Sequence, residues 1–172
     1  MRAKAIRLLL LDVDGVLTDG RIIYNGSGRE FKSFSIKDGQ GIVLLRRAGL
    51  EVGILSGRRS PAVIARAKEL GIALCQQKVL DKGKALKSIL GMKKIRAEQV
   101  CYMGDDLVDL PVFFRAGLAV AVADSVEEVK ANAHYVTHHP GGQGAVREVC
   151  ELILKAQGKW KKVTHQYFAP SR

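Results

Sequence analysis

Leu8-Leu9-Leu10-Leu11-Asp12-Val13-Asp14-Gly15 is the stretch from which the fold of this chain can be worked out. Four consecutive leucines are typical of a strand that is buried on both faces, as in the middle of a parallel sheet. Two carboxylates and a glycine follow at once, where such a strand would end. One charge at a strand end is common, but two separated by a single residue are hard to explain by folding alone. We therefore expect acids that hold a cation here and act on an anion.

The rest of the chain alternates between short β-rich runs and stretches with helical periodicity. The predicted strands cover residues 6–11, 51–55, 73–76, 100–103, 118–122 and 134–137. The predicted helices cover residues 39–48, 61–70, 84–90, 110–116, 126–131 and 145–156. Gly71 and Gly91 are typical of helix C-termini. The alternation predicts an α/β fold with a Rossmann-like parallel sheet and helices on both faces.

One segment interrupts this alternation. Residues 22–24 and 30–34 are β-rich, and the turn-forming residues 25–28 lie between them, so we expect a β-hairpin over about 21–34. It would project beside the end of the first strand. A chain of 172 residues suits one domain, which we expect to span residues 1–157. Residues 158–172 are basic and show no helical or strand periodicity, so this tail is expected to be flexible.

Composition narrows the class of protein. The chain is 47% hydrophobic and 26% charged, as soluble globular proteins are. No apolar run approaches the roughly 20 residues that a membrane span needs. Its three cysteines, Cys75, Cys101 and Cys150, are widely spaced and form no Cys-x-x-Cys pair, so neither a disulfide framework nor a zinc site is expected. We expect a cytoplasmic protein without a membrane partner.

The formal net charge of +11 leaves two kinds of partner to consider, nucleic acid and small anionic substrates. The aromatic fraction is only 6%, and no motif of a nucleic-acid-binding module is present. Small phosphorylated or carboxylated substrates therefore fit better, and we expect no nucleic-acid partner. The alternative predicts a steeply salt-dependent affinity for nucleic acid.

Further polar residues follow three other predicted strands. Ser56-Gly57-Arg58 comes after the second strand, and Gly104-Asp105-Asp106 followed by Asp109 comes after the fourth. Lys82 lies a few residues beyond the third. Because open parallel sheets bind ligands at the carboxyl ends of their strands, we expect these side chains to meet the acidic pair after the first strand.

Carboxylates, a hydroxyl and cations at one place suit metal-assisted phosphoryl transfer. Mg²⁺ prefers oxygen ligands and usually takes one or two carboxylates together with water and phosphate. One carboxylate can attack phosphorus and form an aspartyl-phosphate if cations screen the approach of the two anions. A second carboxylic acid is needed to protonate the leaving alkoxide and then to activate water. Lys82 is the expected protein cation, with Lys84 as the alternative.

The motifs resemble those of the haloacid dehalogenase-like phosphatase superfamily. All four occur in order, as residues 12–16, residues 56–58, Lys82 and residues 104–109. More narrowly, residues 14–20, 34–39, 104–107, 120–124 and 141–150 resemble the 3-deoxy-D-manno-octulosonate 8-phosphate (KDO 8-phosphate) phosphatase family. The resemblance implies a capless core that hydrolyses this phosphate monoester with Mg²⁺, in the synthesis of lipopolysaccharide KDO. It also implies a homotetramer whose hairpins build a central barrel, so that a neighbouring subunit covers each site.

The resemblance assigns roles to the residues at the strand ends. Asp12 is expected to be the nucleophile and a metal ligand. Asp14 is expected to be the general acid/base and to bind the metal through its backbone carbonyl. Ser56 would hydrogen-bond the phosphoryl group, Lys82 would neutralise it, and Asp105 would complete the metal site.

Contacts with the sugar acid are expected from Asp14, Ser35, Ile36, Lys37, Asp38, Gly39, Arg58, Arg66 and Lys82. Two of these have an ordinary alternative: Asp38 as a turn or helix cap, and Arg66 as a solvated helix residue. Val43 departs from the family pattern, because some members carry a basic residue there. The alternative functions are therefore KDN 9-phosphate or less selective sugar-phosphate hydrolysis and, outside enzymes, a tetramerising module with vestigial activity. The resemblance implies that Asp106 and Asp109 orient Lys82 or the metal shell. Whether these two residues, His138 or Arg147 contribute to the site stays open.

Overall fold

The computed structural model describes residues 2–168 and is built on a six-stranded parallel sheet. Its strands are β1 (Leu8–Leu11), β4 (Glu51–Leu55), β5 (Leu74–Gln76), β6 (Val100–Gly104), β7 (Leu118–Ala121) and β8 (Tyr135–Val136). The order β5-β4-β1-β6-β7-β8 places β1 inside the sheet, with a parallel neighbour on each side. All four residues of β1 are buried, which explains why the strand is a run of leucines rather than an alternating pattern.

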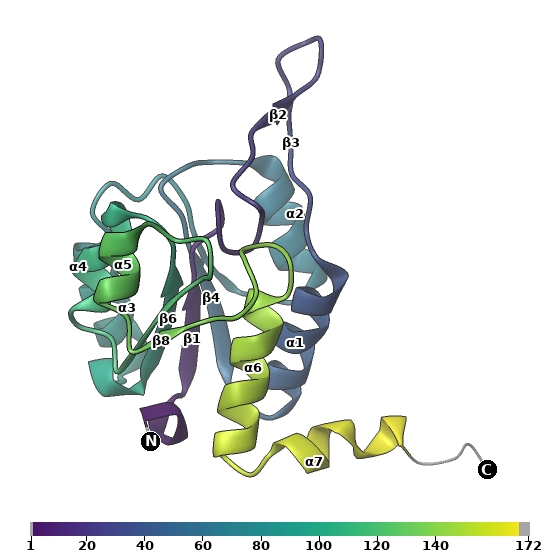
Figure 1. Ribbon diagram of the computed structural model, residues 1–172, viewed down its shortest axis with the longest axis vertical. Helices are drawn as coiled ribbons and strands as arrows, with labels where there is room; N and C mark the ends of the chain where they lie inside the picture. The colour runs from purple at the N-terminus through teal and green to yellow at the C-terminus, as the bar shows by residue number, and fades with distance from the viewer. Residues whose placement is uncertain (1, 169–172) are drawn as a thin grey trace.

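Helices cover both faces of this sheet (Figure 1). On one face lie α1 (Ile36–Arg47), α2 (Pro61–Glu69) and α6 (Ala145–Ala156), and on the other lie α3 (Lys82–Lys93), α4 (Leu110–Phe113) and α5 (Glu127–Ala131). Leu9 and Leu11 pack into the first core, whereas Leu8 and Leu10 pack into the second. The predicted α/β architecture with two covered faces is confirmed.

Several helix ends differ from the prediction, each for a local reason. α1 begins three residues earlier, because the Ser35 hydroxyl accepts a hydrogen bond from the Asp38 N–H and caps the first turn. α3 continues through Gly91 to Lys93, and Lys94, with φ 52°, takes the left-handed conformation that usually follows a helix. Gly71 does take that conformation after α2, with φ 66°.

The segment after β1 forms a separate antiparallel pair, β2 (Ile23–Tyr24) and β3 (Glu30–Phe31). The Asn25 side chain closes the turn by accepting hydrogen bonds from the Ser27 and Arg29 N–H groups. In Figure 1 this hairpin rises beyond the sheet at the end opposite the N-terminus, where β1 has finished. It carries a set of apolar side chains that are 47–60% exposed, namely Ile22, Ile23, Tyr24 and Phe31.

The C-terminal residues form a helix where the sequence shows no periodicity. α7 (Trp160–Thr164) and a 3-10 turn (His165–Tyr167) follow α6. The Trp160 ring lies 5.6 Å from the Arg147 guanidinium and 5.2 Å from the Lys155 ammonium, both on α6. This tertiary contact accounts for a helix that local pattern did not predict. Residues 160–167 are thus helical where the sequence predicted no regular element. The last part of the tail that was expected to be flexible, residues 169–172, lies outside the described residues.

Three other 3-10 turns complete the chain, Arg2–Ala5, Ala97–Gln99 and Leu107–Asp109. Within residues 2–168, none of the helices has both the length and the apolar character that crossing a bilayer requires.

Candidate active site

Carboxylates that follow two neighbouring strands meet at the carboxyl end of the sheet. Asp12 comes after β1, and Asp105 and Asp109 come after β6, and one carboxylate oxygen from each lies within 4.8 Å of the others. The strand register produces this meeting, since Leu11 pairs with Met103 and the Asp12 N–H donates to the Met103 carbonyl over 3.0 Å. The structure thus brings Asp12 and Asp105 together.

Lys82 reaches this cluster from the first residue of α3. Its Nζ lies 2.9 Å from Asp12 Oδ2 and 2.6 Å from Asp109 Oδ1, and its side chain is only 3% exposed. Burial alone would lower the pKa of Lys82, but the charges of Asp12 and Asp109 raise it, so the ammonium form is favoured. Lys84, the alternative cation, is exposed and pairs with Asp81. The structure therefore places Lys82 in the site.

Asp109, which was expected to orient Lys82 or the metal shell, is fully buried, and both of its carboxylate oxygens accept hydrogen bonds. Its Oδ1 accepts hydrogen bonds from Lys82 Nζ and from the Tyr102 hydroxyl, both over 2.6 Å. Its Oδ2 accepts from the N–H groups of Asp105 and Asp106, over 2.9 and 3.3 Å. Asp109 therefore orients Lys82 and holds the loop that carries Asp105.

The acidic cluster fits a divalent cation. Asp105 Oδ1 is buried and has no hydrogen-bond partner among residues 2–168. Burial, together with the charges of Asp12 and Asp109, raises the pKa of Asp105 to about 8. Burial also raises the pKa of Asp12 to about 6, although Lys82 opposes that shift. Crowded carboxylates with an unpartnered oxygen are the donor set that a hard cation such as Mg²⁺ takes.

A cleft of about 460 Å³ opens over these residues. Its lining is Asp12, Asp14, Gly20, Ser56, Gly57, Arg58, Val79, Leu80, Lys82, Asp105, Asp106 and Val108. All four predicted catalytic residues are in this set. Ser56 is buried at the end of β4, where its Oγ accepts a hydrogen bond from the Arg58 N–H over 3.3 Å. This turn contact leaves the hydroxyl proton of Ser56 for a ligand.

Asp14 faces the base of the hairpin. Its Oδ1 is ion-paired with Lys32 Nζ, and its Oδ2 lies 3.5 Å from Arg58 Nε. Glu30, on β3, pairs with Lys32 over 3.1 Å and also with Arg58. Asp14, Lys32, Glu30 and Arg58 thus form a closed circle of alternating charges, which we call the charge ring.

Sequence reasoning missed two members of the charge ring, Lys32 and Glu30. A Glu-x-Lys pair on a hairpin is typical of ordinary solvent-facing β residues. The available signal was their spacing of two, which puts both side chains on one face of a strand beside the expected site.

The loop before α6 packs directly on the loop that carries the acidic pair. A Cβ atom on Gly141 would overlap the Gly15 carbonyl oxygen, and one on Gly142 would press against the Thr18 backbone. The Gly142 N–H donates to the Val16 carbonyl over 2.9 Å. Only glycine fits this approach of two backbones.

Other residues that were expected to contact the sugar acid lie elsewhere in this chain. Residues 35–39 start α1 and Arg66 lies on α2, and neither group lines the cleft formed by the described residues. Arg66 donates to the Ser35 carbonyl over 3.2 Å and pairs with Glu69 over 2.8 Å.

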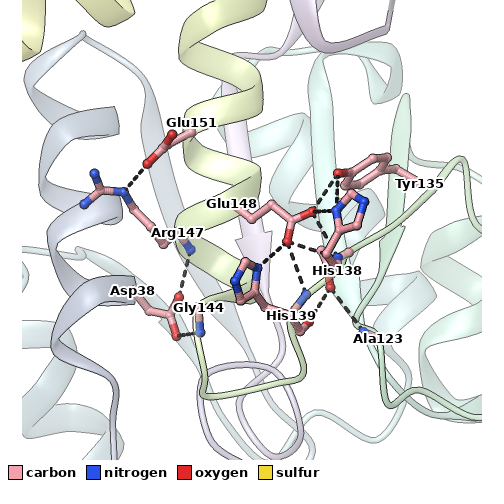
Figure 2. A network of polar contacts seen from close by, with 10 residues as sticks. Asp38, Ala123, Tyr135, His138, His139, Gly144, Arg147, Glu148 and Glu151 are labelled. Atoms are coloured by element: carbon pink, nitrogen blue, oxygen red, sulfur yellow. Dashed lines mark hydrogen bonds and ion pairs between the residues drawn. The ribbon is translucent and has the colours of Figure 1, made fainter.

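The Asp38 carboxylate is buried and faces α6 (Figure 2). It accepts hydrogen bonds from the N–H groups of Gly144 and Arg147, over 3.2 and 2.8 Å. These are orphan donors at the start of α6, so the contact is a helix cap supplied from another helix. The contacts of the Asp38 side chain are those of a cap on α6, which agrees with the helix-cap alternative rather than with a contact to the sugar acid.

Figure 2 also shows a carboxylate clamp on the loop before α6. Glu148 accepts hydrogen bonds from the N–H groups of His138 and His139 and from the Tyr135 hydroxyl, and it pairs with both imidazoles. Partial burial opposes ionisation, but the bonds from Tyr135, His139 and His138 lower the pKa of Glu148 to about 2. His138 is thus bound to a structural carboxylate, and Arg147 pairs with Glu151 on the same helix over 2.7 Å.

Comparison with known proteins agrees with this geometry. Residues 76–149 match a family model described as haloacid dehalogenase-like hydrolase. The chain is 47% identical to the 3-deoxy-D-manno-octulosonate 8-phosphate phosphatase KdsC of Yersinia pestis over 163 residues, which cover 95% of this chain and 87% of that protein.

Solved structures of similar proteins share the fold over nearly the whole chain. A probable YrbI family phosphatase from Pseudomonas syringae gives a TM-score of 0.97 at 46% identity, covering 99% of this chain and 97% of that one. The KDO 8-phosphate phosphatase of Moraxella catarrhalis, in complex with magnesium, phosphate and KDO, gives 0.94 at 43% identity, covering 96% and 95%. The chain belongs to the 3-deoxy-D-manno-octulosonate 8-phosphate phosphatase family of haloacid dehalogenase-like hydrolases.

Proposed function

We propose that this protein is a Mg²⁺-dependent phosphatase that hydrolyses KDO 8-phosphate through an aspartyl-phosphate, as a step toward lipopolysaccharide. The observation that carries the proposal is the buried contact of Lys82 with Asp12 and Asp109, beside the unpartnered Asp105 oxygen. A nucleophilic carboxylate, a fixed cation and a metal-binding acid then share one cleft. Family membership supports the choice of substrate.

The metal would be held by the Asp12 and Asp105 side chains and the Asp14 backbone carbonyl. When bound, it supplies positive charge between the attacking carboxylate and the phosphate dianion. Lys82, kept cationic by its two carboxylate partners, binds a phosphoryl oxygen, and the Ser56 hydroxyl donates to another.

The reaction then takes two steps. An Asp12 carboxylate oxygen attacks phosphorus while the bond from phosphorus to the sugar oxygen breaks and Asp14 gives that oxygen its proton. Asp14 next takes a proton from water, and the resulting hydroxide attacks phosphorus and releases phosphate from Asp12. Both carboxylates return to their starting states.

We propose a homotetramer in which hairpins meet and a neighbouring subunit covers each cleft. The exposed apolar side chains of the hairpin support this, because a two-stranded sheet is marginal on its own. The position of residues 35–39 and Arg66 outside their own cleft also supports it, since these groups would then complete a neighbour's site. We place the enzyme in the cytoplasm, which suits three thiols that form no disulfide within the described part of the chain.

A less selective sugar phosphatase, or one for KDN 9-phosphate, is the second candidate. Val43 favours it, because this side chain packs against the apolar core where some relatives were expected to present a basic group. A substrate anion would lose one contact at that position.

Phosphate release from KDO 8-phosphate, KDN 9-phosphate and simple sugar phosphates, with Mg²⁺ and with EDTA, tests the proposal. We expect the highest kcat/KM for KDO 8-phosphate, only with Mg²⁺, and no turnover by a folded Asp12→Asn variant. Equal kcat/KM values across the substrates would refute the narrow assignment. Absence of Mg²⁺-stimulated release from every sugar-acid phosphate would favour a tetramerising module, and turnover by Asp12→Asn would refute the nucleophile.

A further inference from the structure

Lys32 is the least accessible member of the charge ring. Its side chain is 1% exposed, although it comes from a hairpin that projects from the body of the protein. A buried ammonium is tolerated only when it is paired, and its two carboxylate partners are Asp14 and Glu30. The base of the hairpin is therefore tied to Asp14 by an ion pair whose ammonium is buried.

Lys32 sits behind Asp14 rather than in the cleft. Asp14 and Arg58 line the cleft, whereas Lys32 and Glu30 do not belong to its lining in the described part of the chain. Lys32 is thus placed to act on a substrate only through the side chain of Asp14.

The two oxygens of Asp14 are consequently in different positions. Oδ1 is taken by Lys32, while Oδ2 lies on the side of Arg58, which lines the cleft. A general acid must hold its proton within hydrogen-bond reach of the leaving oxygen, so the orientation of this carboxylate decides its efficiency. An aspartate without a partner at Oδ1 would be free to rotate about its terminal torsion, which has a broad energy profile.

We infer that Lys32 is a positioning residue, which fixes Asp14 Oδ1 from the hairpin so that Oδ2 faces the leaving-group oxygen of the substrate. Glu30 completes the device by balancing the Lys32 charge and by holding Arg58 on the other side of the ring. The inference rests on the proposed function, in which Asp14 is the general acid/base.

The test compares two substrates that differ in their need for a proton. The sugar alkoxide of KDO 8-phosphate must be protonated as it leaves, whereas p-nitrophenolate leaves without a proton. The ratio kcat/KM covers substrate binding and the steps up to formation of the aspartyl-phosphate, so it leaves out the later hydrolysis. General-acid catalysis then enters the ratio only for the substrate whose leaving group needs a proton. For Lys32→Met we expect a loss of about 100-fold with KDO 8-phosphate and less than about threefold with p-nitrophenyl phosphate.

Matched variants separate positioning from folding. Lys130→Met, in α5, removes a surface lysine and should leave kcat/KM unchanged for both substrates. Lys32→Arg keeps the cation and should recover most of the kcat/KM on KDO 8-phosphate that Lys32→Met loses. A double variant, Asp14→Asn with Lys32→Met, should be no slower on KDO 8-phosphate than Asp14→Asn alone, because Lys32 acts through Asp14.

Equal losses on both substrates, or additive losses in the double variant, would overturn the inference. If Lys32→Met does not fold, the pair Glu30→Gln with Lys32→Met removes both charges together and must show the same selective loss. A wild-type enzyme that turns over p-nitrophenyl phosphate but no sugar-acid phosphate would instead refute the proposed function.

Discussion

Asp109 uses both of its carboxylate oxygens inside the protein, and the rest of the site depends on it. Lys82 and Tyr102 bind one oxygen, and the backbone of the Asp105 loop binds the other. A residue in this position sets geometry without touching the substrate. Its effect on activity and its effect on stability should therefore appear together.

Asp109→Ala should lower the free energy of unfolding by about 3 kcal/mol, because it leaves a buried hydroxyl and part of a buried ammonium unpaired. Turnover should fall as well, since Lys82 loses its orientation. Tyr102→Phe removes one hydrogen bond from the same oxygen and should cost about 1 kcal/mol. Urea unfolding of both variants measures whether Asp109→Ala loses more free energy of unfolding than Tyr102→Phe. An Asp109→Ala protein as stable as wild type would show that the buried contacts of Asp109 do not stabilise the fold.

The crowding of carboxylates predicts how the protein responds to metal. Mg²⁺ should raise the melting temperature of the wild type relative to EDTA, because it binds the folded state and relieves the repulsion of Asp12 and Asp105. Asp105→Asn removes one of those charges. It should abolish the response to Mg²⁺ without lowering the melting temperature in EDTA. An equal Mg²⁺ response in both proteins would show that the metal binds elsewhere.

At the residue scale, the sequence predicts well the groups that stand next to strand ends. Asp12, Ser56 and Asp105 follow from strand order, because parallel strands end at one edge. The choice of Lys82 over Lys84 rested on the family resemblance. It predicts poorly the groups whose role depends on long-range contacts. Lys32 was missed for that reason.

At the scale of elements, α6 and its preceding loop form a clamp around the acidic loop. Asp38 caps the start of α6 from α1, and Glu148 binds the loop from within α6 (Figure 2). Two carboxylates on neighbouring helices thus fix the glycine-rich loop in place. Because Gly141 and Gly142 pack on the backbone of Gly15 and Thr18, the fixed loop also holds the loop that carries Asp12 and Asp14.

The Glu148 clamp predicts a pH dependence of stability. Its pKa is lowered from an ordinary value of 4.5 to about 2, so the unfolded state binds the proton more readily. The contribution is complete above about pH 5 and is lost as the pH falls from 4.5 toward 2. Glu148→Gln should therefore be less stable than wild type at pH 7 by about 1–2 kcal/mol, discounted from the full shift because the carboxylate is partly solvated.

Urea midpoints of both proteins at several pH values measure the difference. The gap should narrow steadily below pH 4.5, while Glu127→Gln, on the surface of α5, should follow wild type throughout. A gap that does not change with pH would mean that the lost contacts are not ionic.

A pair of glycines tests the close approach of the two loops. Gly141→Ala forces a Cβ into the Gly15 carbonyl, so we expect a loss of about 2–3 kcal/mol together with a drop in kcat. Gly91→Ala is the matched control, because it lies in α3 with open space around it and should stabilise the helix by about 1 kcal/mol. Thermal melting and steady-state kinetics of both variants give the comparison. A Gly141→Ala enzyme with normal kcat would contradict the coupling of the loops.

The helices also show where the local sequence pattern is enough to predict an element and its ends. The range predicted for the last long helix, 145–156, is that of α6, because its apolar face is regular and strongly periodic. α7 was not predicted, because Trp160 holds it against α6 through contacts that no local window contains. Gly91 was wrongly assigned to a helix end, since an exposed glycine is tolerated inside a helix at a modest cost.

At the scale of the whole molecule, the hairpin is the segment through which we propose that the subunits assemble. It projects from the sheet (Figure 1). Its apolar side chains are exposed. Its base, however, is anchored to the cleft by the charge ring. In the proposed tetramer, assembly and catalysis would therefore depend on the same segment.

Charged substitutions on the hairpin should break the proposed assembly. Tyr24→Glu combined with Phe31→Glu places two carboxylates on the apolar surface, so we expect monomers by analytical ultracentrifugation and a large loss of activity on KDO 8-phosphate. Met92→Glu, an equally exposed apolar position in α3, should leave the oligomer intact. A wild-type protein that sediments as a monomer would refute the tetramer, and monomeric variants with full activity would refute the need for a neighbour.

The central position of β1 also has a consequence for how the protein is made. The run of four leucines is synthesised before its sheet neighbours β4 and β6 and well before the covering loop at Gly141. At roughly 5–20 residues per second, the delay before the covering loop emerges is on the order of 10 s. Until β4 and then β6 emerge, this strongly apolar segment lacks its sheet partners and is open to chaperones or to aggregation. β1 thus reaches its final surroundings only after segments that are made later have joined it.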